Sequence, residues 1–424
     1  MKTDILIVGS GASGLYCALN IPEEKEVLVV TKDEAKKSDS YLAQGGICVL
    51  RNQEDYDSFF EDTMRAGHYE NKPESVHIMI QSSQAVIEDL VSTGVEFEKD
   101  GDEYAYTREG AHSNPRILYR EDETGKEITK NLLEEVVKRK NITVIEKFTM
   151  VDLICKNNTC YGIIGHNNMG EYSSIEADYT ILATGGIGGL FQHSTNYEHL
   201  TGDSLALALK YDIKLRDIDY IQIHPTTLYT EDKGRSFLIS ESVRGEGGIL
   251  LNQKGERFVN ELLPRDVVTN AIFKEMEKEG SKHVWLSMEK IPNEEIKEHF
   301  PNIYKRCLEE GYDVTKEPIP VVPSQHYFMG GIDVNEHSKT SMERLYAVGE
   351  TACNGVHGRN RLASNSLLES LVFAKRAAID LMKNYEPSFF EGSVKIKQEQ
   401  YNNYEAKYKE TVLKAIEKEK CNHE

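Results

Sequence analysis

The chain has 424 residues, of which 50 are Lys or Arg and 70 are Asp or Glu, so its formal net charge is −20. That charge argues against nucleic acid as a partner, although a locally basic pocket could still take an anionic small ligand. At about 150 residues per domain, the length predicts two or three units. The composition, 39% hydrophobic and 28% charged, is typical of a soluble globular protein.

The seven cysteines are scattered, without a CxxC pair or a metal-ligand spacing. This pattern predicts reduced thiols in a cytoplasmic protein and no metal site. The N-terminus lacks the architecture of a signal peptide. No apolar run reaches the roughly 18 residues of a membrane-spanning helix. We therefore expect neither a membrane nor a nucleic-acid partner.

The first strong motif opens the chain. The apolar run at 4–8 predicts a buried parallel strand, and "GSGASG" follows it and leads into a helix and a second apolar run. This is a βαβ unit with G-x-G-x-x-G at its first turn, which is typical of dinucleotide binding. Gly9 would allow the tight turn, Gly11 the approach of a pyrophosphate, and Gly14 close packing of the helix. Lys32 stands where an acidic residue usually holds the ribose; it contacts adenosine or phosphate, or it is a solvated lysine.

Two later segments, 178–190 and 343–358, repeat the plan of an apolar strand followed by a glycine turn. Together with the first strand they should belong to one sheet, because each ends where a nucleotide cofactor would lie. Amphipathic patterns predict helices over 55–67 and 74–94, and a strand-rich stretch over about 95 to 180.

The segment from about 218 to 327 differs in character, and an inserted domain is the economical interpretation. A long helix is expected to begin near Ser366. The last segment, from about 390, is rich in Lys, Glu and Tyr and predicts a surface or interface helix.

A cationic set lies in turn-like contexts beside Gly, Pro or Ser. Taken singly, each member is more often structural, but together they suit a dicarboxylate, because guanidinium and imidazole groups pair with carboxylates. An arginine can also transfer protons if a carboxylate such as Glu241 supplies them. No hydrolase triad or metal-ligand spacing is visible. The set comprises His224, Arg244, Arg265, His326, Arg359 and Arg361.

The stretch "TREGAHSNPR", 107–116, allows two hypotheses. Its polar residues, glycine and proline favour a solvated loop. Alternatively, the loop points charge at a small charged ligand, in which case Glu109 needs a role among the cations.

A series of motifs then occurs in the order known from one family: "VGSGASGL", "YLAQGGI", "TREGAHS", "ATGG", "TGDSLALA", "IHPTTL", "SESVRGEGG", "LPRDVV", "QHYFMGGI", "LYAVGE" and "NRLASNSLLE". From residue 1 to about 385 the chain resembles the L-aspartate oxidases of the succinate dehydrogenase/fumarate reductase flavoprotein superfamily. The resemblance implies an α/β fold: a Rossmann-like FAD-binding domain, 1–217 and 328–390, interrupted by an α+β capping domain, 218–327. Residues 391–424 would form a helical tail, a short remainder of the C-terminal helical domain that family members usually carry.

The resemblance also implies which residues hold FAD. Lys32 replaces the usual acidic residue, Asp203 and Glu350 would hold adenine-side and ribityl hydroxyls, and Ser366 and Leu367 would lie against the isoalloxazine. Succinate dehydrogenases carry, at the position of Asp39, the histidine that attaches FAD, so we expect a non-covalent flavin. The pyrophosphate would lie on Gly9, Ser10, Gly11, Ala12, Ser13 and Gly14, and the flavin would be wrapped by Asp39, Ser40, Tyr41, Leu42, Ala43, Gln44, Gly45 and Gly46.

For the substrate, Arg265 would be the proton-transfer arginine, with Glu241 and Arg244 as its relay. Glu109 would meet the α-ammonium that distinguishes aspartate from a plain diacid, in a loop where Ala111 replaces the usual second glycine. The implied substrate contacts are Glu109, His224, Ser240 (usually threonine), His326, Arg361 and Ser364.

The implied activity is FAD-dependent oxidation of L-aspartate to iminoaspartate, the first step of de novo NAD biosynthesis through quinolinate. Oxygen or fumarate would reoxidise the flavin, and quinolinate synthase is a candidate partner. The alternative is a soluble fumarate reductase or succinate dehydrogenase-type flavoprotein, which shares the dicarboxylate clamp. A catalytically silent flavoprotein that acts as a binding partner is a third hypothesis, disfavoured by the retained arginines and histidines.

Overall fold

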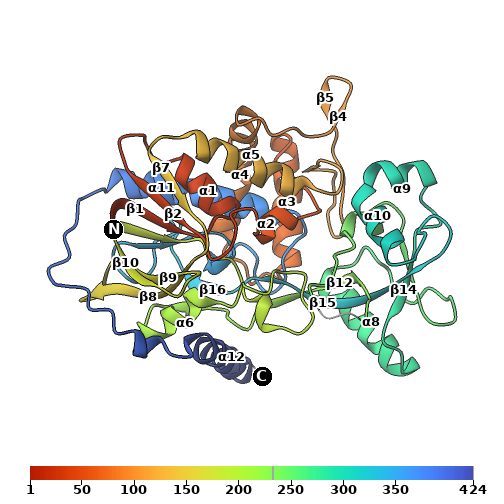
Figure 1. Ribbon diagram of the computed structural model, residues 1–424. Coiled ribbons are helices and arrows are strands. Elements are labelled where there is room, and N and C mark those ends of the chain that lie inside the picture. The colour runs from red at the N-terminus through yellow and green to blue at the C-terminus, as the bar shows by residue number, and fades with distance from the viewer. Residues whose placement is uncertain (232–233, 424) are drawn as a thin grey trace.

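The structure is a computed structural model that describes residues 1–231 and 234–423. Figure 1 shows two parts: a large sheet flanked by helices, and a smaller sheet-and-helix unit, in green and cyan, that projects to the right. The smaller unit is formed by the middle of the chain, and the large sheet by both the first half and the later residues.

The large sheet joins strands from the beginning, middle and end of the chain. In the described part of the chain, the strand order is β7-β2-β1-β10-β9-β8, with β17 also paired to β10. β10 runs parallel to both β1 and β17, so the prediction that three strand–glycine elements share one sheet is confirmed. The strands are β1 (Lys2–Val8), β2 (Val27–Val30), β7 (Ile142–Ile145), β8 (Phe148–Lys156), β9 (Thr159–Asn167), β10 (Tyr172–Leu182) and β17 (Leu345–Ala347).

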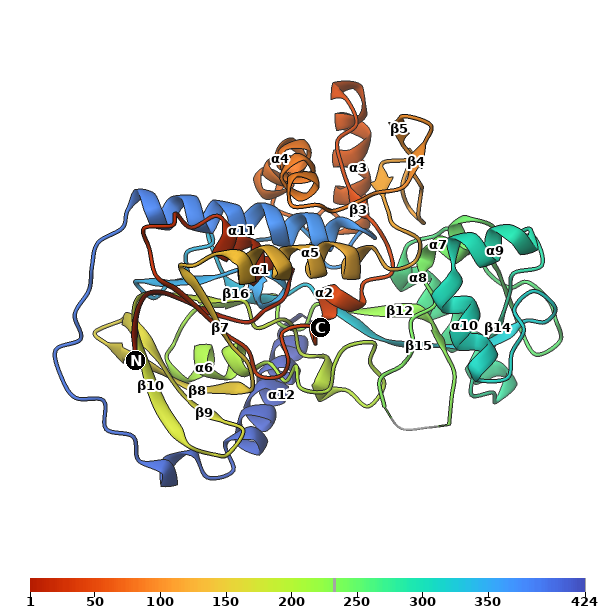
Figure 2. The same ribbon diagram turned by 45° about the horizontal axis from the view of Figure 1, so that its top comes forward.

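Strand β1 is buried on both faces, as its continuous apolar sequence predicts. Ile5 and Ile7 pack into one hydrophobic cluster, while Leu6 and Val8 pack into another on the opposite face. Figure 2 shows helices α1, α5 and α11 on one side of the sheet and α6 and α12 on the other. These helices span Ala12–Leu19 (α1), Thr124–Lys138 (α5), Asn365–Lys383 (α11), Asp203–Lys210 (α6) and Tyr404–His423 (α12).

Most predicted helices are present. The predictions over 55–67 and 74–94 correspond to α3 (Tyr56–Ala66) and α4 (Pro73–Ser92), and those near Ser366 and in the tail to α11 and α12. The strand-rich prediction for about 95 to 180 was wrong in its middle, because α5 lies there. Residues spaced three to four apart, Ile128, Leu132 and Val136, bury one face of that helix.

The smaller unit has its own antiparallel sheet, ordered β12-β15-β14-β13, and its own hydrophobic cluster. Its strands are β12 (Ile221–Leu228), β13 (Ile249–Leu251), β14 (Val284–Ser287) and β15 (Ile319–Phe328). Its helices are α7 (Glu241–Gly245), α8 (Arg265–Glu279), α9 (Asn293–His299) and α10 (Pro301–Glu309). β12 and β15 lead from the large-sheet part into this unit (Figure 1). The domain boundaries at 217/218, 327/328 and 390/391 stay predictions.

Short elements complete the fold: α2 (Asp39–Leu42), β3 (Ile47–Cys48), β4 (Lys99–Asp100), β5 (Glu103–Tyr104), β6 (Ile117–Leu118), β11 (Leu215–Arg216), β16 (Gly331–Asp333) and β18 (Ala352–Cys353). None of the helices in the described ranges combines the length and the apolarity needed to cross a membrane.

Candidate active site

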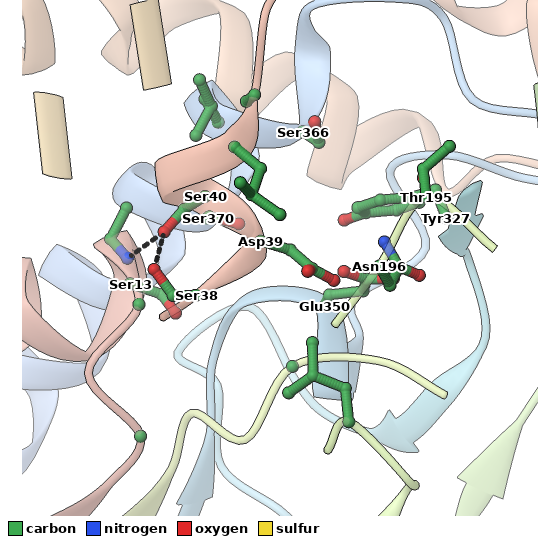
Figure 3. Close-up of a pocket in the computed structure, with 18 of the residues that line it drawn as sticks. Ser13, Ser38, Asp39, Ser40, Thr195, Asn196, Tyr327, Glu350, Ser366 and Ser370 are labelled. Atoms are coloured by element: carbon green, nitrogen blue, oxygen red, sulfur yellow. Dashed lines mark hydrogen bonds between the residues drawn. The ribbon is translucent and has the colours of Figure 1, made fainter. Parts of the chain in front are cut away.

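One cavity runs from the first glycine loop to the junction with the smaller unit. It is lined by the end of β1, by α2, by the starts of α6 and α11, and by β12, β15, α7 and α8. Figure 3 shows labelled side chains from α2, β15, α11 and residues 195–196 turned toward one space. The carboxyl ends of parallel strands meet here, which is where open α/β sheets bind their ligands.

The glycine loop brings backbone to the cavity wall. Gly9 has φ +121°, and a Cβ there would lie 2.0 Å from the carbonyl oxygen of Ala183. A Cβ at Gly11 would meet protein atoms only at 3.5 Å or beyond. At Gly14 it would lie 2.2 Å from Gly9 O, so this glycine serves helix packing, as expected. The loop therefore leaves open space at the N-terminus of α1, where a phosphate group is favoured.

Ser40 ties α2 to this loop. Its Oγ accepts a hydrogen bond from the Ala12 N–H at 2.9 Å and lies 3.0 Å from Ser38 Oγ (Figure 3). At the adjacent end of the cavity, Lys32 Nζ donates to Asp203 Oδ2 at 2.8 Å and to Thr201 Oγ1 at 3.1 Å. Lys32 therefore stands after β2, where an acidic residue is usual. Its ammonium group pairs with Asp203, an acid at the start of α6.

Two partly buried acids, Asp39 and Glu350, extend into the middle of the cavity near Asn196 (Figure 3). Burial raises the pKa of Asp39, and burial together with the charge of Asp39 raises the pKa of Glu350. Asp39 Oδ2, Gln44 Oε1 and Asn196 Oδ1 are buried without a hydrogen-bond partner in the described residues. Such atoms require an outside partner, and the hydroxyl and N–H groups of FAD would provide one. The glycine cradle and these acceptors therefore fit FAD.

The opposite end of the cavity carries two histidines. His224 on β12 and His326 on β15 have ring centroids 5.0 Å apart. Burial and the charge of Arg265 lower the pKa of both rings well below its usual value, which favours their neutral forms. His326 Nδ1 bonds Thr195 Oγ1 at 2.7 Å, while His224 Nε2 has no partner in the described residues and stays available. A strand irregularity around Pro225 accompanies the placement of His224.

Arg265, at the start of α8, is the centre of a buried charge chain. Its Nε donates to Glu241 Oε2 at 2.5 Å, and its Nη1 donates to Gln222 Oε1 at 2.8 Å. Arg244 Nη2 lies 3.4 Å from the same Glu241 oxygen. Burial alone would raise the pKa of Glu241, but the two arginine charges outweigh it and lower that pKa. The predicted relay residues are thus in contact.

Arg361 precedes α11, and none of the carboxylates in the described ranges forms an ion pair with it. Its Nη1 donates to Ser366 Oγ at 2.8 Å, and its guanidinium lies 4.6 Å from the ring centroid of Tyr327. Burial and the charge of Arg265 lower the pKa of Arg361 to about 10, so it remains a cation at neutral pH. A buried arginine whose Nε lacks a partner in the described residues is suited to binding an anion.

The 107–116 loop is only partly solvated: Arg108 and residues 113–115 are exposed, whereas Glu109, His112 and Arg116 are buried. The solvated-loop hypothesis therefore holds for part of the loop but is wrong for Glu109. Arg116 is 0% exposed and pairs with Asp55 at 2.9 Å and with Asp62 at 2.8 Å. His112 accepts from Arg116 at its Nδ1 and bonds Ala363 O at 3.0 Å through Nε2. These contacts hold Glu109 in the cavity wall at 3% exposure.

Ser240 caps α7, its Oγ accepting from Ser242 N at 3.2 Å, and it lines the cavity with Ser364 and Leu367.

Of the predicted site residues, Gly14, Tyr41 and Arg244 do not line the cavity. Arg359, counted in the cationic set, is exposed on the surface and pairs with Glu70 at 3.4 Å. The remaining predicted residues line the cavity: Gly9, Ser10, Gly11, Ala12, Ser13, Lys32, Asp39, Ser40, Leu42, Ala43, Gln44, Gly45, Gly46, Glu109, Asp203, His224, Ser240, Glu241, Arg265, His326, Glu350, Arg361, Ser364, Ser366 and Leu367.

Sequence reasoning missed several polar residues at the cavity, among them Thr195, Asn196 and Tyr327. Thr195 and Asn196 reach it because Ser194 forms a bridge with Gln325 of β15. Gln222, which accepts from Arg265, was also missed. It stands two residues before His224 and so lies on the same face of β12, and this spacing could have identified it.

The chain is similar to known proteins both in sequence and in fold. Residues 4–367 match the family model of the FAD binding domain. An L-aspartate oxidase from Clostridium perfringens (strain 13 / Type A) is 53% identical over 379 residues, which cover 89% of this chain and 86% of the relative. One from Clostridium acetobutylicum is 51% identical over 397 residues, with coverages of 93% and 91%. A solved E. coli quinol fumarate reductase chain has a TM-score of 0.84 at 26% identity, over 99% of this chain and 74% of that one.

Proposed function

The chain belongs to the L-aspartate oxidase family of FAD-binding flavoproteins, and from that premise we propose that it oxidises L-aspartate to iminoaspartate. The observation that carries the proposal is the joint presence of two ligand-binding features in one cavity. Arg265, Arg361 and two neutral histidines supply donors for two carboxylates, while Glu109 supplies a buried acceptor for an amine.

Each residue has a role in this proposal. Arg361 binds one carboxylate of aspartate, and His224 and His326 donate to the other. Glu109 accepts from the α-ammonium, so the carbon that carries it is held in one orientation. When bound, FAD supplies the acceptor for the hydride that aspartate loses. The cavity residues named here are at most 7% exposed apart from His326, so water is largely excluded from the substrate.

The substrate also loses a proton, so that a hydride and a proton leave together and the imine forms. Arg265 is the group proposed to handle the proton, because its Nε contacts Glu241 Oε2 at 2.5 Å and Arg244 lies on the far side of that acid. An arginine cation can accept a proton from the substrate only if it passes one of its own to another base, and Glu241 is the carboxylate placed to take it. Gln222 holds the other end of the guanidinium at 2.8 Å.

Fumarate, a dicarboxylate without an amine, fits the same clamp, and we propose fumarate or oxygen as the acceptor that reoxidises the flavin. Asp39 in place of a histidine supports non-covalent FAD. Transfer of iminoaspartate to quinolinate synthase, the place in NAD biosynthesis and the cytoplasmic location stay predictions.

The test is an anaerobic titration of the FAD-loaded protein. L-Aspartate should bleach the flavin absorbance, while succinate, which lacks the amine, should leave it unchanged. Equal bleaching by succinate would favour the fumarate reductase alternative, and bleaching by neither would favour the catalytically silent flavoprotein.

A further inference from the structure

We propose that Ser242 and Ser364 are specificity-determining positioning residues, whose hydroxyls hold Glu109 as an oriented anion for the substrate α-ammonium. The inference rests on the proposed function. It assigns Ser364 to Glu109 and not to direct contact with a substrate carboxylate.

The two hydroxyls approach the carboxylate from different parts of the fold. Ser242 Oγ, on α7 of the smaller unit, donates to Glu109 Oε1 at 2.9 Å. Ser364 Oγ, at the start of α11, donates to Glu109 Oε2 at 2.6 Å. Each oxygen therefore has one fixed donor, and the plane of the carboxylate is set by both.

No cation of the described residues forms an ion pair with Glu109, although it is 3% exposed. A carboxylate oxygen has about two acceptor positions, and each serine uses one. One position on each oxygen remains for an ammonium group, which has three N–H donors. A diacid without an amine would leave this buried charge unneutralised, and that cost discriminates against it.

The backbone at Ser364 is arranged for this contact. Ser364 adopts φ +60°, which is uncommon for a non-glycine residue and aims its side chain from the helix start. Its own carbonyl accepts from Cys48 N at 3.1 Å. A Cβ at Gly45 would lie 2.9 Å from Glu109 Oε1 and 3.3 Å from Ser364 Oγ, so a larger residue there would crowd the pair.

The electrostatics support the same role. Burial and the neighbouring charge of Glu241 raise the pKa of Glu109, whereas the hydrogen bonds from Ser364 and Ser242 and the charge of Arg265 oppose that rise. Removing one serine hydroxyl removes one of the hydrogen bonds that lower the pKa of Glu109. The pKa of Glu109 then rises further, and a larger fraction of the enzyme carries a neutral Glu109 that binds ammonium poorly.

The experiment uses the full FAD-loaded chain with Ser242→Ala and Ser364→Ala. We expect kcat/KM for L-aspartate to fall about five- to tenfold in each variant, the size of one lost hydrogen bond. The acid limb of its pH profile should move to higher pH. For Ser242→Ala, fumarate reduction driven by a reduced dye should stay within about twofold of wild type, as expected if only amine recognition is lost.

Two further variants and the flavin content complete the design. Ser242→Thr restores the hydroxyl and should recover most of the aspartate activity and the original pH profile. Ser281→Ala is the matched control, because its buried hydroxyl in the smaller unit has no hydrogen-bond partner in the described residues; it should behave as wild type. Flavin content per chain identifies a variant that has lost FAD, and for such a variant the profile is measured with FAD in excess.

The inference is overturned if both alanine variants keep the wild-type pH profile, if they lose aspartate oxidation and fumarate reduction equally, or if Ser242→Thr resembles Ser242→Ala. Failure of the wild-type protein to be reduced by L-aspartate would instead reject the proposed function. The two failures are therefore distinguishable.

Discussion

Glu109 and Glu241 are neighbouring buried carboxylates with opposite surroundings. Glu241 contacts Arg265 and Arg244, whereas Glu109 has two serine hydroxyls and no arginine partner among the described residues. A Cβ at Gly110, the residue after Glu109, would lie 2.4 Å from Glu241 Oε1, so the loop and α7 pack in close contact. The pKa of Glu241 is lowered and that of Glu109 is raised. Such divergence allows two acids in one site to serve different purposes.

Replacing Glu109 by Gln should weaken aspartate oxidation far more than fumarate reduction. The amide keeps the shape but loses the charge-assisted hydrogen bond to the ammonium, which contributes about 1.5–3 kcal/mol. We expect kcat/KM for L-aspartate to fall roughly 10- to 150-fold, and fumarate reduction by much less. Glu103→Gln, on an exposed hairpin, is the control. Equal losses on both substrates would remove amine recognition from the role of this loop.

The pH dependence should separate the two reactions in the wild-type protein. Glu109 binds the ammonium in its ionised form, and burial raises its pKa. Aspartate oxidation is therefore present above that pKa and lost as the pH falls through it. Fumarate has no ammonium, so its reduction should not share this acid limb. The measurement is kcat/KM against pH for both substrates, and an identical acid limb would contradict the assignment.

Arg265→Leu should abolish turnover while FAD stays bound. The substitution removes the cation that contacts Glu241 and Gln222 and leaves Glu241 buried beside Arg244 alone. Flavin absorbance per protein and steady-state rates check both parts. Arg306→Leu, a surface arginine on α10, is the control and should retain activity. Near-normal turnover in Arg265→Leu would reject its role in proton transfer.

All of the flavin should leave the protein on acid precipitation. Asp39 occupies the position where a histidine would be needed for attachment, and a carboxylate is no substitute for the imidazole nucleophile. The measurement compares flavin in the supernatant and the washed pellet. Flavin retained in the pellet would show a covalent bond at some other residue.

Ala111→Gly should stabilise the protein slightly. Ala111 has φ +65°, a conformation that costs an L-residue roughly 1–2 kcal/mol; glycine avoids that cost but gains entropy in the unfolded chain. We expect the free energy of unfolding to rise by up to about 1 kcal/mol, measured by denaturant titration. Ala105→Gly, where φ is not positive, should instead lower it. A loss at Ala111 as large as at Ala105 would contradict the argument from backbone strain.

The 107–116 loop shows why some features were missed. Its composition favours exposure, yet Arg116 is 0% exposed because Asp55 and Asp62 of the α3 region neutralise it. Those acids are more than fifty residues away in the sequence, and no local pattern pairs them with Arg116. Helix α5, within 95–180, was missed for another reason. Its buried apolar residues have helical spacing, but the segment lies between stretches whose pattern predicts strands.

The sequence alone determined the features that depend on local chemistry. Gly9 and Gly14 are required by steric contacts across one strand or within a few residues, and Gly11 leaves open space for a ligand, so their spacing predicted the nucleotide-binding turn. Only the tertiary structure decided which charges meet. Lys32 and Asp203 are 171 residues apart in the sequence, and Ser364 and Glu109 are 255 apart. Such contacts arise when β1, β10 and β17 join in one sheet and the smaller unit packs beside it. The pKa of each buried acid therefore depends on charged and hydrogen-bonding partners that are far away in the sequence.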